Sequence, residues 1–170
     1  MAEAVAPSAG RLAGTTGARV TLLHVIEAHT SGEIHGGHHL TKREEAEDYL
    51  RNMAAKYFRG AANVSWHVHA REVHDVAHSV SDHADEFVPD LIVMCAHGRE
   101  GWWQWYKGTL AHQVVKQSTA PVLLFRWMDT LSPEFPFKRV FIPLDGDPTH
   151  EAGIEAGIEL ARLSLAPVDL

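Results

Sequence analysis

Cysteine, long apolar runs and net positive charge are all scarce in this sequence, and each shortage excludes a class of protein. Cys95 is the only cysteine among 170 residues, so no internal disulfide can form and we expect a reducing compartment. No apolar run approaches the length of a membrane span. The first residues lack the basic start and apolar core of a signal peptide. The sequence therefore predicts a cytoplasmic protein without a membrane partner.

The net charge argues against nucleic acid as a partner. At -7, it disfavours general binding to nucleic acids or anionic membranes. A small anionic ligand stays open, because a local turn can bind phosphate on an acidic protein. The composition is otherwise ordinary, with 45% hydrophobic and 22% charged residues, and the length suffices for one domain with a core.

Strand-like and helix-like patterns alternate along residues 1–126. We expect strands at 19–26, 63–70, 91–95 and 122–125, and helices at 2–13, 40–59, 73–87 and 110–117. Such alternation implies a parallel sheet with helices on both faces. Pro7 counts against the middle of the first helix, and Thr41 with Glu44 predicts a capping box for the second.

A stretch with two prolines, residues 127–137, is typical of a linker. A shorter unit follows, with a predicted strand at 139–144, a helix at 151–163 and the beginning of a strand at 166–170. At an offset of about 148 residues, the segments 3–22 and 151–170 match at seven of twenty positions. We interpret residues 1–126 as a domain that lacks its first strand, and 138–170 as the first strand and helix of a second repeat.

The absent strand has a physical consequence. A sheet that lacks an inner strand leaves N–H and C=O groups unpaired, which is costly when they are buried. The predicted strand Val140–Leu144 could fill the gap, either in its own chain or in a second chain by exchange. The linker is long enough for both routes. The alternative is a fragment of a longer protein, or a reading frame that starts at the wrong place.

One stretch of the sequence carries a family signature. The segment DLIVMCAHGREGWWQWYKGTLAHQVVKQSTAPVLLF resembles the end of a universal stress protein domain, whose signature is Gly, two residues, Gly, nine residues, Gly and then Ser or Thr. Gly98 and Gly108-Thr109 match that spacing, and Cys95 stands in place of the first Gly. RVTLLHVIEA resembles the second strand of the family, and RVFIPLDGDPTHEAGIEAGIELA resembles its first strand and helix. The resemblance covers almost the whole chain, in permuted order.

The resemblance implies an open, Rossmann-like α/β fold with five parallel strands in the order 3-2-1-4-5 and helices on both faces. It places an adenine nucleotide beyond the carboxyl ends of the strands. Gly98, Gly108 and Thr109 would hold its phosphates and ribose, while Val25 and Asp145 would hold the adenine end. ATP, accompanied by Mg²⁺, is the implied ligand, and the implied role is regulation in a stress response.

The resemblance also implies a homodimer, because family members dimerise through their last strand, here Val122–Phe125. An apolar edge strand invites pairing with another chain. No activated nucleophile with a paired base is visible in the sequence. We therefore expect no enzyme, or at most weak ATP hydrolysis.

The residues of the predicted pocket also have structural explanations. Gly98 and Thr109 fit a strand-to-helix turn with a Thr cap. His97 could contact a phosphate, but a hydrogen bond within the loop is the more frequent role of such a histidine. A side chain at Cys95 crowds a backbone approach that glycine permits. A dimerising stress-protein module with a decayed nucleotide site is therefore our second hypothesis.

Two other patterns suggest further chemistry. The segment DGDPT, residues 145–149, resembles the nucleophile motif of haloacid-dehalogenase-type phosphatases, which also requires a Lys and an acidic pair downstream. Among 13 scattered histidines, His74 and His78 have the i, i+4 spacing of metal ligands on one helix face. His35, His38 and His39 gather in the predicted loop 27–39. Without an HExxH motif or a supporting cysteine, we expect solvated polar faces and no metal.

Overall fold

The larger part of the protein lies within residues 1–126 and is built on a pair of long parallel strands with helices on both faces. The structure is a computed structural model that describes residues 2–27, 33–34, 37–38, 40–96, 110–126, 135–147, 151 and 153–170. Strand β1 (Arg19–Glu27) pairs in parallel with β4 (Asn63–Val73), beginning with Arg19 opposite Asn63. Both predicted strands are confirmed, and β4 continues beyond its predicted end at Ala70.

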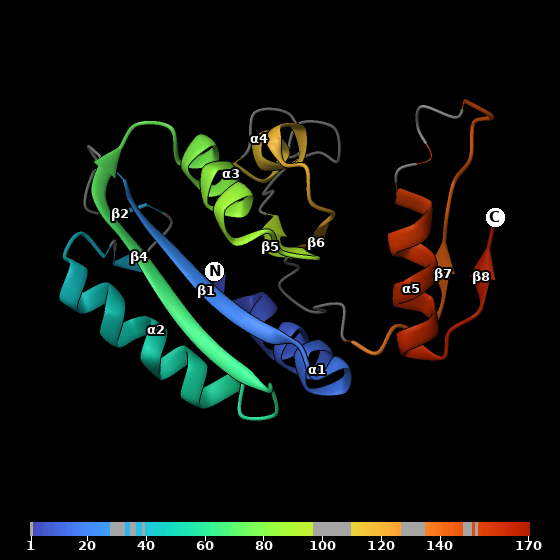
Figure 1. The fold of residues 1–170 in the computed structure, drawn as a ribbon, viewed down its shortest axis with the longest axis horizontal. Coiled ribbons are helices and arrows are strands. Elements are labelled where there is room, and N and C mark those ends of the chain that lie inside the picture. Colours follow the sequence, from blue (N-terminus) through green and yellow to red (C-terminus); the bar gives the residue numbers. More distant parts are fainter. Residues whose placement is uncertain are drawn as a thin grey trace.

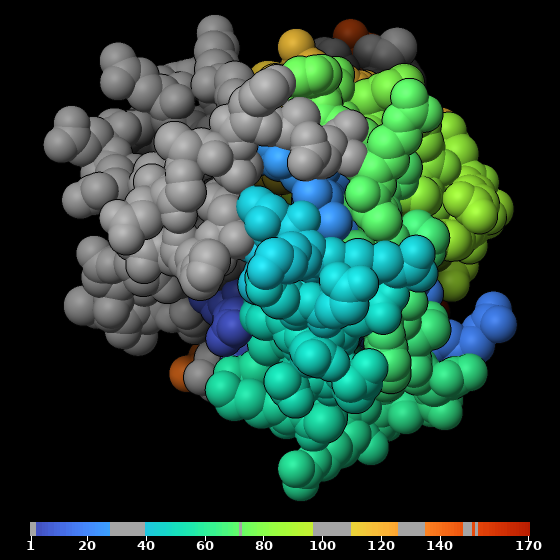
Figure 2. Space-filling model, turned by 90° about the vertical axis from the view of Figure 1, so that its left-hand side faces the viewer, coloured from blue at the N-terminus to red at the C-terminus, as the bar shows by residue number. Residues whose placement is uncertain are grey.

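Alternation of side chains along β1 and β4 explains the two helical layers. One face of the strand pair packs against α1 (Ala6–Thr16) and α2 (Arg43–Tyr57). The apolar side chains on that face are those of Val20, Leu22, Ile26, Val64 and Val68. The other face turns toward α3 (Val76–Phe87), so α2 and α3 lie on opposite sides of the strands (Figure 1). Figure 2 shows the side of the molecule that α2 covers.

The first turns of α1 and α2 correct two predictions. Pro7 lies in the first turn of α1, after the short 3-10 helix η1 (Ala2–Val5). Its missing N–H is not needed there, so it does not interrupt the helix. Helix α2 begins after Lys42, which makes no side-chain cap hydrogen bond, so the predicted capping box of Thr41 with Glu44 is wrong. Glu44 instead places negative charge in the first turn, where the helix dipole favours it.

A second parallel pair consists of β5 (Ile92–Ala96) and β6 (Val122–Arg126). Helix α4 (Leu110–Gln117) lies between these two strands in the sequence. These elements confirm the predicted strands and helix. Each described strand pairs with one other strand, so the predicted five-stranded sheet is not seen. Within the described residues no strand joins β1 to β5, where the order 3-2-1-4-5 puts the absent first strand, and η1 contacts β5.

Two smaller observations complete the larger part of the chain. The short antiparallel strands β2 (Glu33–Ile34) and β3 (Gly37–His38) pair within the segment that we expected to be a loop. A pair of two-residue strands leaves no periodic pattern in the sequence, which explains why the prediction missed it. None of the helices in the described ranges is long and apolar enough to cross a membrane.

The second unit, which lies within residues 138–170, forms its own strand pair. Strand β7 (Val140–Phe141) pairs in parallel with β8 (Val168–Asp169), and α5 (Ile154–Ser164) connects them. β7 is shorter than the predicted strand because Pro143 has no N–H to donate to a ladder. In this single chain β7 thus pairs with β8 and not with β1 or β5. Figure 1 shows α5, β7 and β8 set apart from the long strands.

The helix of the second unit matches α1 in detail. Helices α1 and α5 each contain 11 residues, and their first residues are Ala6 and Ile154, the offset of about 148 found in the sequence. Each is followed by a residue with left-handed backbone, Gly17 with φ 65 and Leu165 with φ 52. The N–H of Ala18 donates to the Ala13 carbonyl, and at the corresponding positions the N–H of Ala166 donates to the Ala161 carbonyl. The two segments therefore share local structure from helix to strand.

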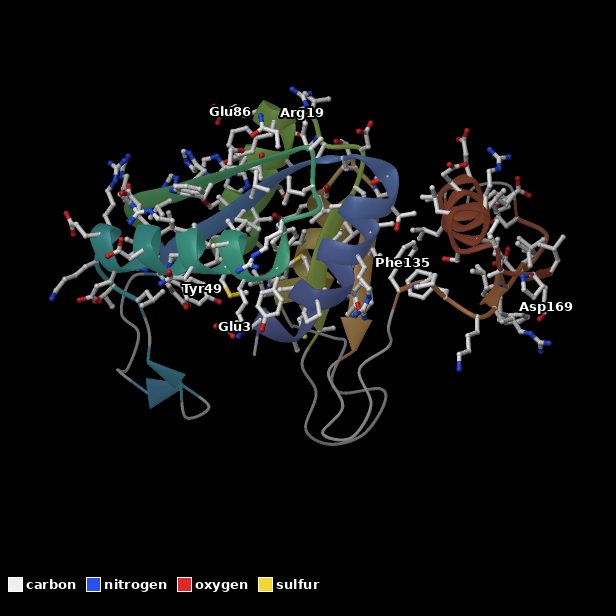
Figure 3. The ribbon with its side chains drawn as sticks, turned by 90° about the horizontal axis from the view of Figure 1, so that it is seen from below. Glu3, Arg19, Tyr49, Glu86, Phe135 and Asp169 are labelled. Atoms are coloured by element: carbon white, nitrogen blue, oxygen red, sulfur yellow. The ribbon has the colours of Figure 1, made fainter. Side chains whose placement is uncertain are left out.

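Phe135, near the end of the predicted linker 127–137, is hydrogen-bonded to α1. Its side chain is only 2% exposed. Its N–H donates to Ser8 Oγ, and its carbonyl accepts a 2.8 Å hydrogen bond from Arg11 Nε. Figure 3 shows Phe135 where the chain passes from the larger part to the second unit. The described end of the linker is therefore anchored on α1.

Candidate functional site

The structure describes two of the six residues predicted to hold a nucleotide. His97, Gly98, Gly108 and Thr109 lie outside the described residues, between the end of β5 and the start of α4. Val25 is half-buried in β1, and Asp145 is exposed in the turn after β7. Because β7 lies apart from β1 (Figure 1), the structure does not bring these two residues together.

The turn at Asp145 has a defined conformation. Its Oδ1 accepts a 3.0 Å hydrogen bond from the N–H of Asp147, which is typical of an Asx turn. Gly146 has a φ of 80, a left-handed conformation that glycine adopts without strain. The carboxylate thus stabilises its own turn beyond the carboxyl end of β7.

The histidines expected on one helix face are not arranged as predicted. Helix α3 begins at Val76 with Asp75 as its cap, since the side chain of Asp75 accepts the N–H of His78. His74 therefore precedes the helix and does not share a face with His78. The Nε2 of His78 lies 3.6 Å from a carboxylate oxygen of Asp82.

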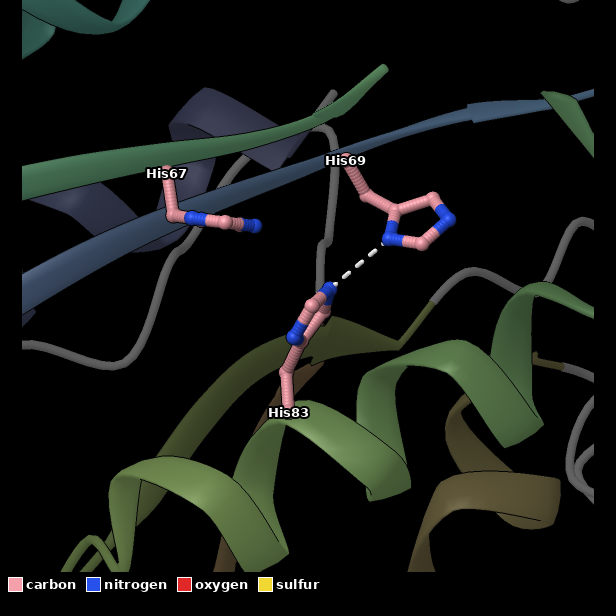
Figure 4. Close-up of side chains that lie close together, drawn as sticks. All are labelled: His67, His69 and His83. Atoms are coloured by element: carbon pink, nitrogen blue, oxygen red, sulfur yellow. Dashed lines mark hydrogen bonds between the residues drawn. The ribbon is translucent and has the colours of Figure 1, made fainter. Parts of the chain in front are cut away.

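A different group of three histidines comes together between β4 and α3. His67 and His69 lie two residues apart in β4, so their side chains point to the same face. His83 approaches them from α3 (Figure 4). Nδ1 of His69 and Nε2 of His83 form a 3.0 Å hydrogen bond. One nitrogen from each of the three rings lies within 4.8 Å of those of the others. We call these three residues the histidine cluster.

The histidine cluster is framed by specific contacts. His83 is 9% exposed, and its second nitrogen, Nδ1, lies 3.4 Å from Oε2 of Glu86. The ring of Phe87 stacks on that of His83, with an interplanar angle of 8° and a centroid distance of 5.5 Å. His67 meets both of these rings edge-on. The pKa of His67 is lowered from its ordinary value, because burial disfavours the charged imidazolium and His83 adds to this effect.

The cluster also lies next to a residue of the predicted pocket. In the β1–β4 register Val25 is the partner of His69, and Leu23 is the partner of His67. Partners in neighbouring strands point to the same face of a sheet. Val25 therefore faces the α3 side, together with the histidines.

Comparison with known proteins assigns the larger part of the chain to a family. The model of the Universal stress protein family matches residues 1–126. The chain belongs to the universal stress protein family. Its parallel strand pairs and covering helices agree with the Rossmann-like α/β fold of that family. The matched segment ends with the last residue of β6.

One solved structure was similar over much of its length. It is that of the hypothetical protein MJ0577, a test case for the structure-based assignment of biochemical function. The two chains are 18% identical with a TM-score of 0.49, and the similarity covers 72% of this chain and 90% of that chain. No curated protein matched the sequence.

Cys95 is the departure of this universal stress protein from the family signature. It is half-buried in β5, and Phe125 of β6 is its partner in the strand register. Its Sγ lies 4.0 Å from the carbonyl oxygen of Ala96. Cys95 is therefore part of a strand pair rather than of an exposed turn.

The histidine cluster lies outside the signature stretch, and sequence reasoning did not select it. The available signal was His67 and His69 at alternate positions of a predicted strand, followed by a histidine in the next helix. That signal is incomplete, because the sequence does not say which turn of α3 faces β4. The contact with His83 comes from tertiary packing.

Proposed function

We propose that this universal stress protein domain binds an adenine nucleotide, ATP with Mg²⁺, and has a regulatory rather than a catalytic role in a stress response. The observation that carries the proposal is the position of the signature stretch in the chain. β5 ends at Ala96 and α4 begins at Leu110, so Gly98, Gly108 and Thr109 lie in the sequence between a strand and the helix that follows it. Such a connection can present N–H groups and a hydroxyl to phosphates.

We further propose that the complete pocket requires β7 of a second chain. The pairs β4–β1 and β5–β6 correspond to 3-2 and 4-5 in the order 3-2-1-4-5, and β7 with Asp145 corresponds to the missing strand 1. In its own chain β7 pairs with β8, so in this arrangement β7 leaves β8, and we propose that it joins the strands of a second chain. Burial of apolar side chains that the second unit exposes would favour it; the most exposed are Phe141 at 67%, Leu144 at 50%, Leu165 at 95% and Leu170 at 77%.

A second contact between chains is proposed at β6. Among the described strands, β6 pairs with β5 alone. Its sequence, VLLFR, is mostly apolar. An apolar edge of this kind can pair with the same edge of another copy, which would give a homodimer.

Calorimetric titration with ATP and Mg²⁺ tests the nucleotide proposal. We expect binding by the intact chain and its loss in Asp145→Ala. Asp147→Ala is the matched control, because it removes a carboxylate from the same turn but from no predicted contact with the nucleotide. Absence of binding at millimolar ATP in a folded sample would contradict the proposal. Hydrolysis of ATP that requires Mg²⁺ and both aspartates would favour the phosphatase-like alternative instead.

Cys95 favours one second candidate, a dimerising module whose nucleotide site has decayed. Its side chain occupies a position where the family signature has glycine, next to Phe125. If the intact chain binds no ATP but Cys95→Gly does, the site has decayed at this residue. If both proteins bind equally, Cys95 is compatible with an intact pocket.

A further inference from the structure

We propose that the histidine cluster of His67, His69 and His83 binds a divalent transition-metal ion of the zinc class between β4 and α3. Three nitrogen ligands from two packed elements lie within 4.8 Å of one another. The sheet fixes the positions of two of them, and the helix brings the third to the same point (Figure 4).

The spacing of the rings suits such an ion. Zinc binds histidine nitrogen at about 2.0–2.1 Å in tetrahedral geometry, so two of its nitrogen ligands lie about 3.4 Å apart. Nδ1 of His69 and Nε2 of His83 are 3.0 Å apart and need to separate by only a few tenths of an ångström. His67 completes the set by side-chain rotation, because it lies on the same face of β4 as His69.

Glu86 supplies an independent observation for the same site. Its Oε2 lies 3.4 Å from Nδ1 of His83. A carboxylate that accepts the Nδ1 hydrogen leaves the lone pair on Nε2, and Nε2 is the nitrogen that faces His69. Histidine ligands of metals are usually held by a partner of this kind on their other nitrogen. The contact with Glu86 therefore orients His83 as a metal site requires.

The ligand set selects the kind of metal. Imidazole nitrogen suits zinc, copper, nickel and cobalt, whereas calcium and magnesium require several oxygen ligands. Three protein ligands leave a fourth tetrahedral position for water or an exogenous group. His67 and His69 are half-buried rather than buried, which leaves that position a route to solvent.

The test uses the full chain, without an affinity tag and stripped of metal, in the absence of nucleotide. Zn²⁺ affinity is measured by competition with a chromophoric chelator, and Co²⁺ is added to follow the visible absorption bands of a four-coordinate ion. We expect one site with a four-coordinate Co²⁺ spectrum. Glu86→Gln should weaken Zn²⁺ binding by about 10- to 100-fold, and His67→Asn or His69→Asn should weaken it by more.

Two controls separate this site from other histidines. His78→Asn changes a side chain on the same helix that is 69% exposed, and it should leave the affinity unchanged. The triple variant His35→Asn, His38→Asn and His39→Asn removes three of the four histidines of the segment 27–39 and should also leave the affinity unchanged. Circular dichroism shows whether each variant is folded, and the two half-buried ligands avoid reliance on the buried His83.

Three results would overturn the proposal: no Zn²⁺ binding by the stripped protein, full affinity in folded His67→Asn and His69→Asn, or loss of the site in the triple variant. None of these measurements involves ATP. Failure of the metal site and failure of the proposed nucleotide site are therefore separate outcomes.

Discussion

The segments α1–β1 and α5–β8 share a local structure, but they bury different amounts of it. In α1 five residues are buried, namely Ala6, Ser8, Gly10, Leu12 and Ala13. In α5, all of whose residues are described, Ala161 is the buried one. β1 pairs with β4 over most of its length, whereas β8 pairs with β7 at two positions. Helix, cap and strand direction thus follow from the local sequence, and burial follows from the neighbours.

The neighbours in question are α2 and β4. Met53 and Phe58, at the end of α2 and just after it, form a core cluster with Ala6 and Ala13 of α1. The second unit has no counterpart to these elements among the described residues, so apolar side chains such as Leu165, 95% exposed, stay in solvent. Substitutions in the two segments therefore measure what these neighbouring elements contribute to the free energy of unfolding.

The largest difference is expected for Leu12→Ala and Leu160→Ala. These leucines occupy corresponding positions, but Leu12 is 7% exposed and Leu160 is half-buried. Removing a buried leucine side chain costs about 2–5 kcal/mol of unfolding free energy, and we expect this for Leu12→Ala. Leu160→Ala should cost about 1 kcal/mol or less, since much of its side chain is already in water. Urea unfolding monitored by circular dichroism measures both.

Protein concentration sharpens this prediction. If the second unit docks on another chain, the urea midpoint of the intact protein rises with concentration. Leu160→Ala then becomes more costly at high concentration, while Leu12→Ala does not change. Equal costs for the two variants in a dilute, monomeric sample would contradict the proposed role of the neighbours.

The next difference concerns two helix glycines. A Cβ at Gly10 would lie 2.0 Å from the carbonyl oxygen of Tyr57, so Gly10→Ala forces α1 away from the end of α2. Overpacking of this kind costs about 1–3 kcal/mol or more. A Cβ at Gly157 would lie 3.1 Å from Cδ1 of Ile142, the flexible end of a side chain. Gly157→Ala should therefore be neutral or stabilise α5 by up to about 1 kcal/mol through helix propensity.

Thermal unfolding of both glycine variants, followed at the helix signal, gives the comparison. A loss of stability in Gly157→Ala as large as that in Gly10→Ala would mean that Ile142 cannot move. It would also mean that the second unit is packed as tightly as the first.

A smaller effect is expected at the two helix ends. Gly17 and Leu165 both have left-handed backbones, which cost a residue with a Cβ about 1–2 kcal/mol. Nothing lies near a Cβ at Gly17, so Gly17→Ala should destabilise the larger part by about 1 kcal/mol through conformation alone. Leu165→Gly should stabilise the second unit by less, since glycine also gains freedom in the unfolded chain. Hydrogen exchange of α5 measures the latter, and faster exchange in Leu165→Gly would contradict it.

Local pattern was enough to predict most elements but not the histidine cluster. Helix α4 has the predicted bounds of 110 and 117 because its apolar residues repeat with helical spacing. For α3 we expected Val73, Val76, Ala77 and Val80 to form the inward face. Ala77 is buried, but the other buried residues of the helix are Ser79, Ser81, His83 and Ala84. The face of a helix that meets a sheet depends on the elements around it, here β4 and α4. A site built across that contact is therefore invisible to periodicity.

The proposed nucleotide pocket rests on a different kind of sequence signal. The spacing from Gly98 to Gly108-Thr109 is a family pattern, and the family assignment now rests on the match over residues 1–126. The place of Asp145 relative to the other predicted pocket residues was not predictable from sequence. It depends on which strand β7 pairs with, and in this chain that strand is β8. Strand pairing over such a distance depends on which chain supplies the partner.

The smallest expected effect is a difference in alkaline stability that only the larger part can show, because residues 138–170 contain no tyrosine. Burial, with Glu3 as the second cause, raises the pKa of Tyr49 to about 12 from 10.0. Glu3 of η1 and Tyr49 of α2 lie toward one another in Figure 3. The folded state therefore favours the protonated phenol. The contribution of Tyr49 to folding stability is fully present below the unfolded pKa of about 10 and is lost as the pH rises toward 12.

Tyr49→Phe removes this ionisation while it retains the ring. We expect the melting temperature of the intact protein to fall more steeply than that of Tyr49→Phe between about pH 9 and about pH 11, because unfolding of the intact protein also releases the phenol of Tyr49, which then ionises. Since Tyr49 is only half-buried, solvent screens its charge and the effect stays small. Parallel slopes for the intact protein and Tyr49→Phe would show that the contact of η1 with α2 opens before the phenol ionises.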